Sequence, residues 1–157
     1  MIDLEHIIQE AGGRGLNGDD YIRATEFLRA WHGGDTNQSG VFETEREVIR
    51  LATMGRCKAE ARLVQTGRGH WLAGYSFDSP TYGGGGPASV WSRVAYETRD
   101  EAVKEIAAEL ADRFQGLVDD ISSTVTEPMK RDAAKMVCLL KAVVQPPAPK
   151  AMQLSLF

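Results

Sequence analysis

Apolar residues recur at helical spacing in the first third of the chain. One such segment follows Asp3, which favours a helix N-cap, and stops at Gly12 and Gly13. Residues 18–34 predict a second helix and residues 44–55 a third, which opens with Thr44 and Glu47 in capping-box spacing. The apolar positions behind these three helices are Leu4, Ile7, Ile8, Ala11, Tyr21, Ala24, Leu28, Trp31, Val48, Leu51 and Ala52.

The spacing of apolar residues changes in the middle of the chain. Residues 59–66 alternate, with Ala61 and Leu63 on one side, and predict a strand; residues 70–77 are rich in aromatic residues and predict another. Residues 67–69 would form the tight turn between them. Residues 79–88 contain four consecutive glycines and two prolines and predict a mobile loop, after which residues 89–97 predict a third strand.

Helical spacing returns after residue 97. Thr98 and Glu101 form a second capping box, and Pro128 marks the first turn of a last helix. The sequence therefore predicts an α+β fold, in which N-terminal helices precede a small antiparallel three-stranded meander and two C-terminal helices cover it. Residues 1–144 would form one domain, divided into a helical part, 1–55, and a meander with helices, 59–144.

A proline-rich stretch, residues 145–152, separates this domain from the last five residues, which are Gln153, Leu154, Ser155, Leu156 and Phe157. This pentapeptide resembles the motif by which bacterial polymerases and mismatch-repair proteins bind the DNA sliding clamp, the beta subunit of DNA polymerase III. The resemblance implies that Gln153, Leu156 and Phe157 carry most of the recognition, with Leu154 assisting. It covers five residues and implies nothing about the fold of the domain.

Two other interpretations of the same pentapeptide remain open. The tail could pack on its own domain as an edge strand, or it could be a degradation tag read by a protease. The clamp interpretation is preferred because the large apolar side chains follow a proline-rich spacer, which would hold them away from the domain.

Composition limits the classes of partner. The formal net charge of -4 disfavours non-specific duplex DNA binding, which draws its affinity from cationic side chains. The first residues lack a basic segment followed by an apolar run, so no signal peptide is expected, and no stretch is apolar enough to predict a membrane span. Cys57 and Cys138 are expected to be buried or half-buried thiols in a reducing cytoplasm.

Two loops resemble ligand-binding motifs. Residues 35–40 match the first half of a calcium-binding loop and lie between two predicted helices, but the twelfth position is Arg46 rather than glutamate. A polar turn without metal is therefore expected there. The glycine run at residues 83–86 lacks the lysine of a phosphate-binding loop, so no cofactor is expected either.

Aromatic and arginine residues alternate around the predicted meander. Arg68, Arg93, Tyr82 and Trp91 could form a surface that stacks on single-stranded nucleic acid, or they could belong to one face of a core. The three histidines, His6, His32 and His70, are scattered along the chain, and no catalytic residue is assigned.

The sequence therefore predicts a non-enzymatic sliding-clamp-binding protein. It would be an accessory or regulatory factor of DNA replication or repair in the cytoplasm, associated with the nucleoid or replication fork, with a mobile element as one candidate source. Two alternatives remain open: a DNA-processing enzyme or single-strand-binding module localised by the tail, and a toxin that arrests replication.

Overall fold

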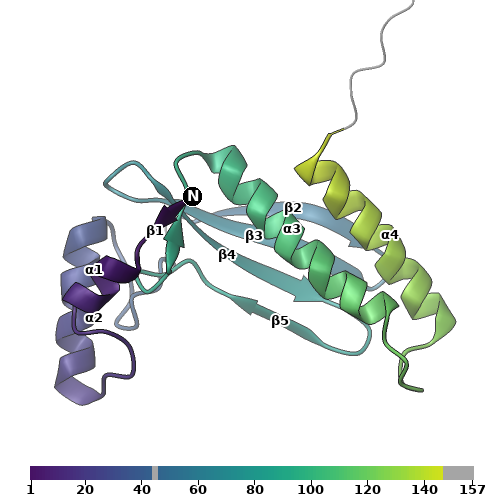
Figure 1. The fold of residues 1–157 in the computed structure, drawn as a ribbon, viewed down its shortest axis with the longest axis horizontal. Coiled ribbons are helices and arrows are strands. Elements are labelled where there is room, and N and C mark those ends of the chain that lie inside the picture. The colour runs from purple at the N-terminus through teal and green to yellow at the C-terminus, as the bar shows by residue number, and fades with distance from the viewer. Residues whose placement is uncertain (44–45, 147–157) are drawn as a thin grey trace, which may run out of the picture.

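The computed structural model describes residues 1–43 and 46–146, in which two long helices cover one face of an antiparallel sheet (Figure 1). The predicted α+β class is confirmed. No helix in these ranges is long and apolar enough to cross a membrane. The elements in chain order are β1 (Ile2–Asp3), α1 (Glu5–Glu10), α2 (Gly18–His32), β2 (Glu47–Met54), β3 (Cys57–Gln65), β4 (Trp71–Asp78), β5 (Gly83–Gly86), β6 (Val94–Ala95), α3 (Arg99–Val118) and α4 (Glu127–Val144).

The main sheet has the order β2-β3-β4-β5, and every neighbouring pair is antiparallel. Alternation along β3 places four residues on the face that the helices cover: Cys57, Ala59, Ala61 and Leu63. All four are 0% exposed, and three of them are small, which lets α3 and α4 approach the strand closely. The first core lies between this face and the two helices.

Helices α3 and α4 begin where the sequence predicts, but their N-caps differ. The Thr98 side chain accepts a hydrogen bond from the backbone N–H of Glu101 at 3.1 Å, while the Glu101 carboxylate accepts one from the N–H of Glu97. Thr126, the N-cap of α4, makes no such side-chain bond, and Pro128 lies in the first turn. The capping box therefore stabilises α3 alone.

A second core lies at the N-terminal end of the molecule, around α1, α2 and the two-stranded β1–β6 sheet (Figure 1). Its fully or almost fully buried residues include Leu4, Ile8, Leu28, Val64 and Leu72. Val64 follows Leu63, whose side chain belongs to the first core, so successive positions of β3 face opposite sides. Strands β3 and β4 therefore contribute to both cores.

The helix predicted over residues 44–55 is wrong, because residues from Glu47 to Met54 form strand β2. Thr44, the expected N-cap, lies outside the described residues. A β-bulge between Arg50 and Ala52 shifts the register by one position, so Ile49 and Ala52 both pack against the first core. An interval of three residues between inward positions imitates helical spacing.

The meander has four strands in place of the expected three. Residues 83–86, expected in a mobile loop, form edge strand β5, which pairs with β4. A Cβ atom on Gly85 would overlap the carbonyl oxygen of Tyr75, so the strand fits its neighbour because it has no side chain there. Residues 89–97, expected as the third strand, form only β6, which pairs with β1 outside the main sheet.

Candidate functional site

The predicted partner-binding peptide, Gln153, Leu154, Ser155, Leu156 and Phe157, lies outside the described residues. The linker between residues 147 and 152 does as well. The described chain reaches Gln145 and Pro146, both exposed, directly after α4. The role of the tail therefore stays a prediction from its sequence.

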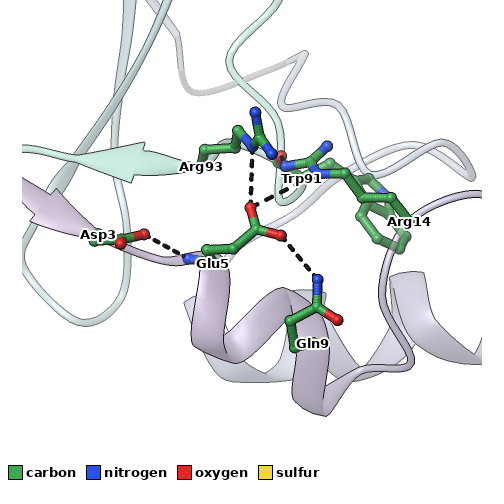
Figure 2. A network of polar contacts seen from close by, with 6 residues as sticks. All are labelled: Asp3, Glu5, Gln9, Arg14, Trp91 and Arg93. Atoms are coloured by element: carbon green, nitrogen blue, oxygen red, sulfur yellow. Dashed lines mark hydrogen bonds and ion pairs between the residues drawn. The ribbon is translucent and has the colours of Figure 1, made fainter.

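Of the four candidate nucleic-acid-binding residues, Trp91 and Arg93 lie in one polar network (Figure 2). Arg93 donates to the carboxylate of Glu5 at 3.0 Å, and Arg14 lies 3.8 Å from the same carboxylate while donating to the carbonyl oxygen of Trp91. The hydrogen bond from Gln9, and after it the hydrogen bond from Arg93 and the charges of Arg93 and Arg14, lower the pKa of Glu5. Glu5 therefore offsets part of the positive charge that Arg93 would offer to a phosphate.

The Trp91 side chain packs into the fold. Its ring stacks on that of Tyr21 from α2, with centroids 5.4 Å apart and an interplanar angle of 7°. Its indole N–H donates to the hydroxyl of Thr25 at 3.3 Å. One face of the ring is thus covered, which matches the alternative that Trp91 serves the core.

Arg68 and Tyr82 lie at opposite ends of strand β4. Arg68 belongs to the turn before Trp71, and its guanidinium lies 4.2 Å from the ring centroid of Trp31. Tyr82 lies in the connection after Asp78 and contacts Phe77 edge to face. Eight residues of extended chain separate the two ends by roughly 20 Å. The four candidates therefore do not form one surface, and their nucleic-acid role stays a prediction.

The polar loop at residues 35–40 uses its own ligand-type oxygens internally. The side-chain oxygen of Asn37 accepts from the backbone N–H groups of Ser39 and Val41, at 2.9 and 3.1 Å. Arg29 donates to Thr36 and to the carbonyl oxygen of Asn37. The loop follows α2 but leads into strand β2, so the expected helix–loop–helix context is wrong. Residues 1–43 and 46–146 contain no group of three side chains suited to a metal ion.

The structure brings together two histidines that the sequence leaves apart. His32 is 1% exposed; its Nε2 lies 3.2 Å from the carbonyl oxygen of Val90, and its Nδ1 lies 3.4 Å from Nε2 of His70. Burial and the neighbouring His70 lower the pKa of His32 to about 4. The backbones of Gly33 and Gly67 are in contact, so the end of α2 lies against the β3–β4 turn. These two glycines are the sequence signal that could have indicated that the two histidines lie close together.

Aromatic rings and one cation surround the two histidines. Trp31 packs edge to face on His32 and contacts His70, and Arg68 covers the ring of Trp31. Within the described residues no carboxylate lies among these contacts, and the acceptor that faces His32 is the carbonyl oxygen of Val90. His6 is not part of this cluster.

The two thiols differ in their exposure to solvent. Cys57 is buried as predicted, and burial raises its pKa, with Asp132 adding to the effect. Cys138 is exposed on α4, so the expectation that it is buried or half-buried is wrong. The two residues are free thiols.

Comparison with known proteins adds no relative: no protein-family model matches the chain, and no curated protein or solved structure is significantly similar to it.

Proposed function

We propose that the chain is a sliding-clamp-binding protein, an accessory or regulatory factor of bacterial DNA replication or repair. The single observation that carries this proposal is the pentapeptide at residues 153–157, placed after a proline-rich spacer. A five-residue match of this kind arises by chance in roughly one of 10⁵ to 10⁶ windows at average residue usage.

The chemistry of the pentapeptide suits a pocket. Leu154, Leu156 and Phe157 each gain about 1.5–3 kcal/mol when fully buried. Gln153 offers both donors and an acceptor, which can fix the register of an extended peptide. Ser155, between the two leucines, is small and polar and can face solvent.

Residues 1–43 and 46–146, which the structure describes, contain two hydrophobic cores. Both cores are built from side chains between Ile2 and Val144. The proposal assigns Leu154, Leu156 and Phe157 to the pocket of a partner and to neither of these cores.

On this proposal the protein acts by binding to the clamp and not by catalysing a reaction. It would fill the peptide pocket of the clamp, displace a polymerase that needs the same pocket, or bring its own body to the replication fork in the cytoplasm. Both outcomes depend on the same five residues, so one set of variants tests them together.

The test is binding of the full chain to purified bacterial sliding clamp, in competition with a labelled polymerase-derived clamp peptide. Changing Leu156 and Phe157 to alanine should abolish competition. A matched control is Ile121→Ala, which removes an apolar side chain that is 98% exposed on the body and should compete like the unchanged protein. Competition that survives the double change would remove the basis of the proposal.

A further inference from the structure

The two long helices that cover the sheet carry charges of opposite sign. Helices α3 and α4 lie side by side and run in opposite directions (Figure 1). On α3 and its C-cap, the exposed carboxylates of Asp112 and Asp119 are seven residues apart and share one face. On α4 the exposed ammonium groups are those of Lys135 and Lys141. Within residues 1–43 and 46–146 none of these four side chains forms an ion pair; the ion pairs on the two helices involve other residues.

A groove of about 360 Å³ lies between the two helices. Its lining includes three apolar side chains, those of Ala108, Ala111 and Val144. Asp112 lines it from α3 and Lys141 lines it from α4. These two charges therefore lie at the same level along the helix pair, on opposite sides of the groove.

The second pair of charges also lies at one level. Each helix rises about 1.5 Å per residue, and the two run in opposite directions. Seven residues beyond Asp112 on α3 is Asp119, and the same rise on α4 leads back from Lys141 to residue 134, next to Lys135. The acidic row and the basic row are thus matched in spacing.

This arrangement restricts the kind of partner. Exposed Glu105 extends the acidic row and exposed Arg131 extends the basic one, while the spacing of Lys104 from Ala108 and Ala111 puts it on the side of α3 that faces α4. A nucleic acid would be attracted by α4 and repelled by α3, and a basic protein surface would meet the reverse. A surface that suits both rows carries both signs in the same arrangement, and the chain itself has that surface.

We propose that a second copy of the chain docks on this face, about a two-fold axis that runs along the groove. Such an axis lays α3 of each copy over α4 of the other and preserves the level along the helices. Asp112 then faces Lys141 of the second copy, and Asp119 faces Lys135. Each contact occurs twice, because the interface is isologous. The proposal concerns residues 99–145 and is independent of clamp binding.

The first test is sedimentation equilibrium of the full chain at protein concentrations up to about 0.5 mM. Exposed ion pairs are individually weak and are screened by salt. The expected result is a dimer in about 20 mM salt that dissociates in about 500 mM salt. A parent protein that stays monomeric at low salt would contradict the proposal.

Charge reversal then locates the interface. One variant carries Asp112→Lys with Asp119→Lys, and the other carries Lys135→Glu with Lys141→Glu. Each variant alone sets like charges against each other and should associate at least about tenfold more weakly than the parent. An equimolar mixture restores opposite charges at both contacts, so it should regain the dimer.

The matched control carries Glu10→Lys with Glu26→Lys, which reverses two exposed carboxylates on α1 and α2. It changes the net charge as much as the α3 variant does and should dimerise like the parent. An equal loss in this control would assign the effect to net charge and overturn the proposal.

Two further outcomes would also overturn it: reversed variants that each dimerise like the parent, and a mixture that stays monomeric. Circular dichroism checks that the variants fold, as their exposed positions predict. If the change at Asp119 unfolds the first variant, Asp112→Lys alone takes its place in the mixture.

Discussion

His70 places its Nε2 atom 3.4 Å from Nδ1 of His32, across the contact between α2 and the β3–β4 turn. Nε2 of His32 faces the carbonyl oxygen of Val90, so the neutral ring donates there and leaves Nδ1 to accept from His70. Protonation of His32 would place a charge at a position only 1% exposed, next to the imidazole of His70.

Stability should therefore fall in mildly acidic solution. The pKa of His32 is lowered from 6.5 to about 4, so between these values the unfolded chain binds more protons than the folded one. The contribution is complete above about pH 6.5 and is lost as the pH falls towards 4, with a slope of roughly 1 kcal/mol per pH unit. Urea unfolding at a series of pH values measures it.

The matched variant for this prediction is His32→Gln, which keeps a donor for the Val90 carbonyl and cannot titrate. Above pH 4.5 this variant should reduce the dependence of stability on pH. It should not remove that dependence, because burial also lowers the pKa of His70. The largest cause of the lowered pKa of Glu47 is its hydrogen bond with Arg99. Carboxylates of this kind lose their contribution to the free energy of unfolding only below their ordinary pKa of 4.5. Acid destabilisation confined below that value would contradict the role of His32.

Gly74→Ala should destabilise the sheet, whereas Gly86→Ala should not. A Cβ on Gly74 would lie 2.5 Å from the backbone nitrogen of Ala88, which cannot move without displacing the chain after β5. Overpacking of this kind costs about 1–3 kcal/mol. A Cβ on Gly86 meets nothing within 4 Å, so that change should stay within about 0.5 kcal/mol of the parent. Equal melting temperatures for the two variants would contradict the close approach.

The two long helices offer a matched pair of cap substitutions. Thr98→Ala removes the acceptor for the Glu101 N–H and should cost about 1 kcal/mol. Thr126→Ala, at the N-cap of α4, removes no such bond and should cost clearly less. Chemical unfolding of both variants gives the difference, and an equal loss would mean that the Thr98 bond contributes nothing of its own.

A synthetic peptide ending in residues 153–157 should bind the sliding clamp within about tenfold of the intact chain, a difference of ~1.4 kcal/mol. The proposal assigns the contact to the tail, so the body adds little affinity. Titration calorimetry on the peptide and the chain makes the comparison. A gap much larger than tenfold would show that the body touches the clamp as well.

Duplex DNA should bind the isolated protein weakly at physiological salt, at or beyond the ~100 μM limit of non-specific binding. The net charge is -4, and Arg93 is already paired with Glu5. Fluorescence anisotropy with a labelled duplex measures the affinity. Tight binding that weakens steeply with added salt would favour a DNA-binding body, and variants of Arg68 and Arg93 would then locate the surface.

The sequence predicted the helices best, because their signals are local. Thr98 and Glu101 mark the start of α3 by a bond they make with each other, and Pro128 marks the first turn of α4. Strand β2 was missed because its bulge is a property of the pairing with β3, which the spacing of residues 47–54 does not express. β5 was missed because glycine fits both a free loop and a strand held against its neighbour.

The candidate sites divide in the same way. A short linear motif such as residues 153–157 can be proposed from sequence because its chemistry lies in consecutive residues, and here it stays a prediction. The pairing of His32 with His70 depends on how α2 docks against the β3–β4 turn.

The pairing of Ile2 with Ala95 in the β1–β6 sheet has a consequence for synthesis. More than half of the chain separates the two strands, so during synthesis β1 has no pairing partner until β6 has emerged. The side chains of Leu4, Ile7 and Ile8 also lack packing partners until then, because Val90 and Ala95 belong to the same core. The segment with β1 and α1 is therefore translated well before its packing partners, and during that interval its apolar side chains are open to chaperones.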